Sequence, residues 1–223
     1  MTDLLEEDMS EVEHEYIKEY ITSLIGSHSG ILKEIEEYAS ENSIPIVHRE
    51  MARFLELMIN MKRPSRVLEL GTAVGYSAIL MSLSSHKKNH ITTIERDKNM
   101  VEIARKNIKR YNFEQYIDVI EGDCMEILKN IREKFDLIFI DAGKAHYNHF
   151  LPYCLKLLDE EGVIVADNVL FRGMVASDEL VKRRKITIVK RMREYLKIVS
   201  DDNKFITSII PMGDGIAVTM RRN

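Results

Sequence analysis

The stretch Arg66-Val-Leu-Glu-Leu-Gly-Thr-Ala-Val-Gly-Tyr-Ser77 decides the fold class, because a short apolar run leads directly into a glycine turn and an apolar helix. Further short apolar runs follow, separated by longer amphipathic stretches. The predicted strands are Arg66–Leu70, His90–Ile94, Ile117–Glu121, Asp136–Asp141 and Val163–Asp167, and the predicted helices are Ser77–Leu83, Asn99–Tyr111, Met125–Ile131, Tyr147–Leu158 and Arg184–Ile198. This alternation predicts right-handed crossovers, and therefore an α/β fold with a mostly parallel sheet.

The two ends of the chain depart from that alternation. Phe205–Ile210 and Ile216–Met220 are separated by only the five residues from Pro211 to Gly215, too few for a crossover helix. We therefore predict an antiparallel hairpin at the C-terminus. Toward the N-terminus, apolar residues recur every three or four positions, which is typical of helices. The prediction is one domain over 1–223, with a helical cap over 1–62 and a core over 63–223.

Composition excludes several protein classes. The 223 residues are 45% hydrophobic and 30% charged, with a net charge of −4, as in ordinary globular proteins. No stretch approaches the ~18 apolar residues of a membrane span, and Met1–Ser10 is acidic, unlike a signal peptide. Cys124 and Cys154 form no zinc-binding spacing. We expect a cytoplasmic protein with neither a membrane partner nor a DNA partner.

The net charge is unevenly distributed. Residues Met1–Tyr20 carry eight acidic side chains against Lys18 alone, a net −7, whereas Arg172–Lys197 carries nine basic against three acidic side chains, a net +6. Such runs are most often solvated helix faces. A basic cluster in an otherwise acidic protein also suits a phosphate-bearing partner, which would approach the Arg172–Lys197 side.

Polar residues end the first three predicted strands, where an open parallel sheet collects its ligands. Gly71 and Gly75 are spaced GxxxG, with Glu69 just before them, which fits a dinucleotide pyrophosphate poorly and a cationic ligand better. Glu95 ends the second strand and can accept hydrogen bonds from ribose hydroxyls. Asp123 follows the third strand and can meet an adenine amino group or cap the next helix. Together they predict a nucleoside site without a phosphate site.

The fourth and fifth strands end in oxygen ligands. If these strands are neighbours, Asp141, Asp167 and Asn168 converge within ~5–10 Å. Two carboxylates and an amide, without His or Cys, suit Mg²⁺, although Asp at a strand end also begins turns. Lys144 follows closely and has two possible roles: base toward an acidic hydroxyl, or balance for the local carboxylates.

Five segments carry a family resemblance. VLELGTAVGYSA (Val67–Ala78), IER (Ile94–Arg96), GDC (Gly122–Cys124), FIDAGKAHY (Phe139–Tyr147) and DNVLFRGMV (Asp167–Val175) resemble the motifs of class I, cation-dependent S-adenosylmethionine O-methyltransferases, the catechol and caffeoyl-CoA group. The resemblance implies a Rossmann-like fold with a seven-stranded sheet, S-adenosylmethionine and Mg²⁺ as cofactors, and a homodimer. Within the family, IPIV (Ile44–Val47) and IIPMGDGIAV (Ile209–Val218) most resemble the bacterial tRNA 5-hydroxyuridine methyltransferases.

The resemblance assigns roles residue by residue. The implied cofactor-binding residues are Val47, Gly71, Ser77, Glu95, Asp123, Cys124 and Asp141, to which electrostatics adds Glu69 beside the cationic methionine end. The implied metal ligands are Asp141, Asp167 and Asn168, and the catalytic residues are Lys144 and Asp141. The candidate RNA-binding residues are Arg172, Lys182, Arg183, Arg184 and Lys185. Val47 and Cys124 stand where relatives often carry Met and Ala.

Three functions are compatible with these residues. The leading hypothesis is methylation of the 5-hydroxyl of 5-hydroxyuridine at wobble position 34 of tRNA, giving 5-methoxyuridine. The second is O-methylation of a small catechol or hydroxycinnamoyl-type acceptor, which uses the same metal chemistry and needs no basic surface. The third is a catalytically inactive adenosine- or RNA-binding module, against which the intact Asp141, Asp167 and Asn168 argue.

Overall fold

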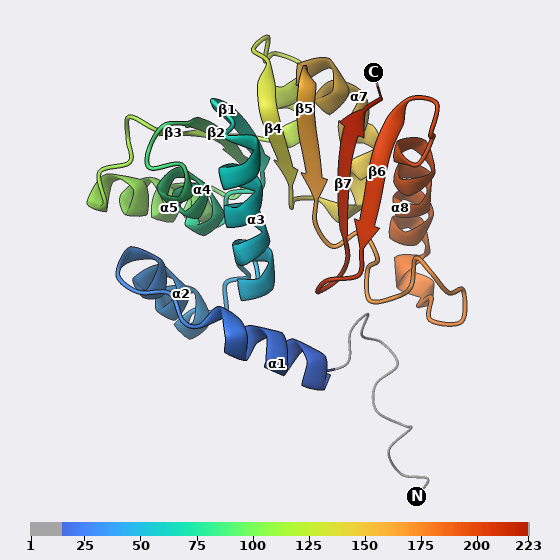
Figure 1. Cartoon of the computed structure of the whole chain (residues 1–223), viewed down its shortest axis with the longest axis horizontal. Helices are drawn as coiled ribbons and strands as arrows, with labels where there is room; N and C mark the ends of the chain where they lie inside the picture. The colour runs from blue at the N-terminus through green and yellow to red at the C-terminus, as the bar shows by residue number, and fades with distance from the viewer. Residues whose placement is uncertain (1–14, 223) are drawn as a thin grey trace, which may run out of the picture.

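The computed structural model describes residues 15–222, and the acidic run at the N-terminus falls largely outside that range. It contains one seven-stranded sheet of order β3-β2-β1-β4-β5-β7-β6, in which β7 runs antiparallel to both β5 and β6 (Figure 1). The strands are β1 (Arg66–Leu70), β2 (His90–Glu95), β3 (Ile117–Glu121), β4 (Phe135–Ile140), β5 (Leu158–Ala166), β6 (Phe205–Ile210) and β7 (Ile216–Arg221). The predicted α/β class, parallel sheet and C-terminal hairpin are confirmed.

Helices cover both faces of the sheet. They are α1 (Glu15–Ile25), α2 (Ile31–Glu41), α3 (Arg49–Lys62), α4 (Tyr76–Ser84), α5 (Lys98–Arg110), α6 (Cys124–Leu128), α7 (Tyr147–Leu157) and α8 (Ile186–Val199), with short 3₁₀ turns η1 (Lys144–His146) and η2 (Arg183–Lys185). None of the helices in residues 15–222 is long and apolar enough to cross a bilayer.

Alternating strand residues build a core on each face. Leu68 and Leu70 of β1 point toward α6, α7 and α8, whereas Val67 points toward α2, α3 and α4. The cap prediction is therefore refined: α3 contributes Met51 and Leu55 to the same core cluster as the strands, so part of the cap is built into the sheet's own core.

Two predicted elements differ from the structure by three or more residues at one end. Strand β5 begins at Leu158, five residues before the predicted start, because the buried Leu158 pairs with Phe135 while charged residues 159–161 lie exposed. Helix α6 ends at Leu128, three residues before the predicted end at Ile131.

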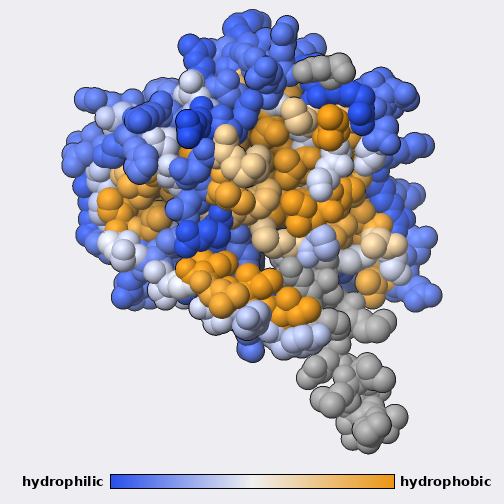
Figure 2. Space-filling model, in the orientation of Figure 1, coloured by the Kyte–Doolittle hydropathy of each residue, from blue (hydrophilic) through white to orange (hydrophobic). Residues whose placement is uncertain are grey.

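None of the helices described in residues 15–222 covers one face of the β5-β7-β6 half of the sheet (Figure 1). Ile206 of β6 is 47% exposed there, beside the half-buried Val218 and Met220 of β7. Figure 2 shows this apolar surface continuing toward α1 and α3, where Leu57 and Met61 are exposed. The homodimer implied by the family resemblance stays a prediction.

Candidate active site

The carboxyl edge of the sheet opens into a crevice where the strand order reverses. Strand β1 pairs with β2 on one side and with β4 on the other, so the loops that follow β1 and β4 diverge. The crevice between them has a volume of about 1,100 Å³. Of the predicted site residues, Val47, Gly71, Ser77, Glu95, Asp123, Cys124, Asp141, Lys144, Asp167, Asn168 and Arg172 line it. Glu69, Lys182, Arg183, Arg184 and Lys185 do not.

Gly71 allows the loops after β1 and β4 to approach each other closely. Its φ of +103° is a conformation that residues with a side chain rarely adopt, and an added Cβ would lie 3.0 Å from Ala142 Cβ and 3.3 Å from Ala142 N. Gly75, at φ +84°, then turns the chain into α4. Gly71 therefore shapes the crevice wall, whereas Gly75 sets the start of α4.

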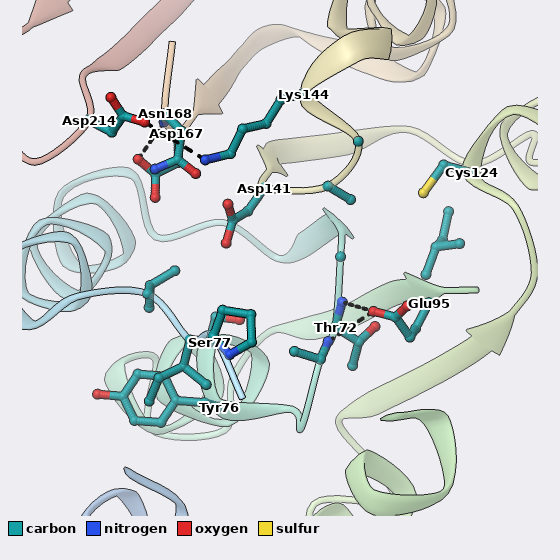
Figure 3. Close-up of a pocket in the computed structure, with 18 of the residues that line it drawn as sticks. Thr72, Tyr76, Ser77, Glu95, Cys124, Asp141, Lys144, Asp167, Asn168 and Asp214 are labelled. Carbon is teal, nitrogen blue, oxygen red and sulfur yellow. Dashed lines mark hydrogen bonds and ion pairs between the residues drawn. The ribbon is translucent and has the colours of Figure 1, made fainter. Parts of the chain in front are cut away.

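Glu95 has more local partners than the sequence suggested. One carboxylate oxygen accepts the backbone N–H groups of Thr72 and Ala73 at 3.2 and 3.0 Å, while the other accepts those of Arg96 and Asp97, both at 2.9 Å (Figure 3). The side chain thus fixes the glycine turn to the end of β2. A ribose would compete with the turn for the same oxygens, since a carboxylate offers about four lone-pair sites.

Glu69 is completely buried beneath the crevice, between β1, β2 and α4. Its Oε2 accepts a hydrogen bond from Thr93 Oγ1 at 2.5 Å, whereas its Oε1 has no hydrogen-bond partner among residues 15–222. Burial raises the pKa of Glu69 to about 7, against the opposing effects of the neighbouring Ser77 and Thr93 hydroxyls. An unpaired, buried carboxylate oxygen behind Ser77 fits a cationic ammonium group in the crevice, although Glu69 itself does not form the crevice wall.

The end of β3 supplies a small apolar wall. Asp123 caps α6 by accepting the N–H of Met125 at 2.8 Å, so the helix-cap role foreseen for it is present. Burial, reinforced by the charges of Asp123 and Glu95, raises the pKa of the Cys124 thiol to about 12. Cys124 is therefore a neutral part of the crevice wall. Val47, only 8% exposed, lines the crevice from the segment before α3.

The ends of β4 and β5 bring the predicted metal ligands together. Because β4 and β5 are neighbours with Ile140 opposite Ala166, Asp141 and Asp167 follow at the same edge. Figure 3 shows Asp141, Asp167 and Asn168 gathered around one part of the crevice, with Lys144 pointing toward them. Asn168 has a φ of +58°, and its N–H donates to Asp167 Oδ1 at 2.6 Å. Asn tolerates this left-handed conformation better than most residues.

The two carboxylates are electrostatically strained in the absence of a cation. Burial raises the pKa of Asp141, and the charge of Asp167 raises it further, while Lys144 opposes both effects. Burial likewise raises the pKa of Asp167, against the hydrogen bond from Asn168 N and the charges of Lys144 and His48. A divalent cation would remove this strain, which favours a metal site over a pair of turn-initiating aspartates.

The donor set fits Mg²⁺ in an open coordination shell. Within residues 15–222, no group of three or more His, Cys, Asp and Glu side chains is placed to hold a metal. The cation would therefore have two carboxylates and the Asn168 amide oxygen, and the other positions would go to water or to an acceptor. Mg²⁺ commonly keeps several such positions.

The structure adds Asp214, which sequence reasoning had assigned only to the hairpin turn. Its Oδ2 lies 3.8 Å from Lys144 Nζ, and burial raises its pKa. Asp214 reaches the site because β7 pairs antiparallel with β5. The buried Tyr147 was also missed: its hydroxyl lies 3.2 Å from Ile140 O and 3.0 Å from Asp167 O, beneath both metal-ligand segments. Only its place in FIDAGKAHY pointed to it.

The basic region Arg172–Lys197 divides into two parts. Arg191 and Arg193 are used internally: Arg191 donates to Ala145 O at 3.0 Å, and Arg193 donates to Val175 O and Asp178. Residues 182–185, by contrast, are exposed beside the crevice. Lys185 Nζ lies 5.9 Å from the centre of the Phe171 ring, as does Lys144 Nζ. The last residue of the exposed basic segment and the candidate catalytic lysine thus lie near the same aromatic ring.

Comparison with known proteins assigns the family. A catechol O-methyltransferase of Niastella koreensis is 32% identical over 74% of this chain and 77% of its own length. A caffeoyl-CoA O-methyltransferase of Populus kitakamiensis is 29% identical over 94% and 95%. The crystal structure of a putative caffeoyl-CoA O-methyltransferase from Staphylococcus aureus is 31% identical, with a TM-score of 0.85 over 93% of this chain and 100% of that one. An O-methyltransferase of Bacillus cereus in complex with SAH, 24% identical with a TM-score of 0.81 over 93% and 97%, shares the fold. Since the family model for O-methyltransferases also matches residues 22–222, this chain belongs to the O-methyltransferase family.

Proposed function

We propose that this protein transfers a methyl group from S-adenosylmethionine to a hydroxyl whose neighbouring oxygen lets both bind Mg²⁺. The observation that carries the proposal is the buried pair Asp141 and Asp167, with Asn168 and Lys144, at the end of a crevice whose other end suits a nucleoside. The inactive-module alternative is disfavoured, because a silent protein has no reason to retain two repelling buried carboxylates.

Each part of the crevice has a distinct task. The glycine turn, Ser77 and the buried Glu69 would hold the methionine end of the cofactor, while Glu95 and the Cys124 wall would frame its nucleoside. Bound Mg²⁺ would supply charge that favours the deprotonated acceptor oxygen. Lys144 lies on the same side as Asp141 and Asp167, where its amine can take the acceptor's proton or balance the resulting oxyanion.

A small aromatic acceptor with two adjacent oxygens, of catechol or hydroxycinnamoyl type, has the stronger support. Two of the relatives reported above are named for catechol and caffeoyl-CoA acceptors, and their similarity covers 74% and 94% of this chain. The proposed metal chemistry favours the same acceptor class. Two adjacent oxygens of the acceptor can bind one cation together, and one of these oxygens then faces the methyl group.

The first test is methyl transfer from S-adenosylmethionine to a catechol and to a caffeoyl thioester, with and without EDTA. We expect EDTA to lower the rate by at least about a hundredfold, because charge stabilisation by the cation is lost, and Mg²⁺ to restore it. Mg²⁺ should also raise the melting temperature of the apoprotein by binding only the folded state. Full activity in EDTA would contradict the metal mechanism, and failure on every adjacent-dioxygen acceptor would contradict the acceptor class.

The 5-hydroxyuridine of tRNA is the second candidate acceptor, and the exposed basic segment 182–185 beside the crevice favours it. Its 5-hydroxyl and 4-carbonyl present the same pair of adjacent oxygens. An RNA would additionally need phosphate contacts around the displaced base. Nucleoside analysis of tRNA from cells lacking the gene decides between the acceptors: hydroxyuridine replacing methoxyuridine supports tRNA, whereas an unchanged profile leaves the small aromatic acceptor.

Charge reversal of Arg183, Arg184 and Lys185 to Glu separates the two acceptors in vitro. If tRNA is the substrate, its methylation should fall at least about tenfold and lose part of its salt dependence, because phosphate contacts are removed. Catechol methylation should change less than about twofold, since surface charge acts weakly at this range. The matched control reverses three exposed lysines near the opposite edge of the sheet, Lys88, Lys106 and Lys109. Equal loss in both triple variants would mean that segment 182–185 is not an RNA contact.

A further inference from the structure

The turn between β6 and β7 is bound to the loop that carries the metal ligands. Gly215 O accepts the N–H of Val169, and Asp214 O accepts that of Leu170, both at 2.9 Å. An added Cβ at Gly215, where φ is +84°, would lie 2.8 Å from Leu170 Cδ1. The backbone of the β6–β7 turn at Gly215 therefore packs directly against the loop that follows Asp167 and Asn168.

The carboxylate of Asp214 has two separate partners. Its Oδ1 accepts the backbone N–H of Arg172, and its Oδ2 faces Lys144 Nζ at 3.8 Å. Figure 3 shows the Asp214 side chain on the far side of Lys144 from Asp141. The Asp214 and Lys144 side chains are 21% and 35% exposed, so the pair is only partly screened by solvent.

The loop held by Asp214 adopts a conformation that needs support. Asn168, Phe171 and Arg172 all have positive φ, at +58°, +46° and +55°. Each such residue costs of order 1 kcal/mol and persists only where its surroundings fix it. The hydrogen bond from Arg172 N to Asp214 supplies part of that support. It does so within the segment that starts with Asp167 and Asn168.

We propose that Asp214 is a positioning residue for methyl transfer. One oxygen holds the Lys144 ammonium beside the acceptor position, and the other holds the backbone of loop 167–172. The role toward Lys144 rests on the proposed function. The role toward loop 167–172 concerns only the fold of that loop. Asp214 touches neither reactant, so its effect passes through Lys144 and through the loop.

A double-mutant cycle tests the link to Lys144. Asp214→Asn keeps the shape and an oxygen for Arg172 N–H but removes the charge that faces Lys144. We expect it to lower kcat about tenfold, since a misplaced Lys144 ammonium stabilises the deprotonated acceptor oxygen less well. In a Lys144→Met background, the same change should alter kcat less than about twofold. If Asp214→Asn lowers kcat equally in the wild type and in Lys144→Met, or lowers it in neither, Asp214 does not act through Lys144.

Amide hydrogen exchange tests the link to the loop without an activity assay. In Asp214→Ala the segment 169–172 should exchange at least about tenfold faster than in the wild type, whereas Asp214→Asn should retain wild-type protection. Unchanged exchange in Asp214→Ala would overturn the role toward loop 167–172. A wild-type protein inactive on every acceptor would overturn the proposed function and the role toward Lys144 together, leaving the exchange result to stand separately.

The chain offers a matched control in Asp201. This residue also pairs with a lysine, Lys204 at 3.1 Å, and also accepts a backbone N–H, from Asn203 at 3.1 Å, but it does not line the crevice. Asp201→Asn should leave kcat and the exchange of segment 169–172 unchanged. A tenfold loss in this variant would show that the effect of Asp214→Asn is not specific to the site.

Discussion

Asp141→Asn is expected to lower kcat/KM for methyl transfer by about a thousandfold while making the metal-free protein more stable. Catalysis should be lost because a metal-binding carboxylate at the reaction centre is removed, comparable to the largest single-donor losses at charge-stabilising sites. Stability should increase because burial raises the pKa of both carboxyls, and the charge of Asp167 raises that of Asp141 further, so the charged form of Asp141 is disfavoured in the folded protein. Sites built for function are commonly costly in this way.

The pH dependence of unfolding tests whether Asp141→Asn makes the metal-free protein more stable. A carboxyl whose pKa is higher in the folded than in the unfolded chain keeps its proton longer when folded. The free energy of unfolding of the wild type should therefore fall as pH rises above about 4, the usual pKa of Asp. It should stop falling once the Asp141 and Asp167 carboxyls are ionised in the folded protein as well. Asp141→Asn should flatten this decline, raising the melting temperature at pH 8 in EDTA by roughly 2–4 °C per kcal/mol relieved.

A carboxylate at the other end of the same strand is the control for Asp141. Asp136 lies at the start of β4, where its Oδ2 accepts the N–H groups of Ser65 and Arg66. Asp136→Asn should leave the dependence of the melting temperature on Mg²⁺ intact, whereas Asp141→Asn should abolish it. An Asp141→Asn protein that is still stabilised by Mg²⁺ and active would remove Asp141 from the metal site.

Glu95→Gln is expected to raise the dissociation constant for S-adenosylmethionine by about tenfold to a hundredfold. Four backbone N–H groups converge on the Glu95 carboxylate, and replacing one oxygen by NH₂ places a donor against two of them. Hydrogen bonds to charged groups contribute about 1.5–3 kcal/mol each, which sets this range. The glycine turn that lines the crevice would lose its anchor at the end of β2. Calorimetric titration with S-adenosylmethionine or its demethylated product measures the effect.

Glu121 is the natural comparison, because it stands opposite Glu95 on the neighbouring strand β3. Its carboxylate faces Lys98 at 3.9 Å and does not line the crevice. Glu121→Gln should change cofactor affinity less than about twofold. If both variants bind alike, Glu95 does not support the cofactor site.

The convergence of the three candidate metal ligands could be predicted from sequence because it follows from a general rule. Buried strands ending in Asp141 and in Asp167-Asn168 bring those side chains together whenever the strands are parallel neighbours, and β4 and β5 are. The same rule placed Gly71, Glu95 and Asp123 on one edge. For Glu95, however, the sequence could not reveal that Thr72 and Ala73 would use its oxygens, since those contacts depend on how closely the β1 turn folds onto β2.

Sequence by itself determined the alternation of strands and helices, the C-terminal hairpin and the edge at which the chemistry gathers, because these follow from hydrophobic periodicity and from local residue order. Only the tertiary structure decided that Asp214 faces Lys144 and that Arg193 is bound to Val175 while the lysines and arginines at 182–185 stay exposed. It also decided that Glu69 is buried beneath the crevice. The physical reason is that these outcomes depend on strand order and on packing between segments far apart in the chain, which no local pattern encodes.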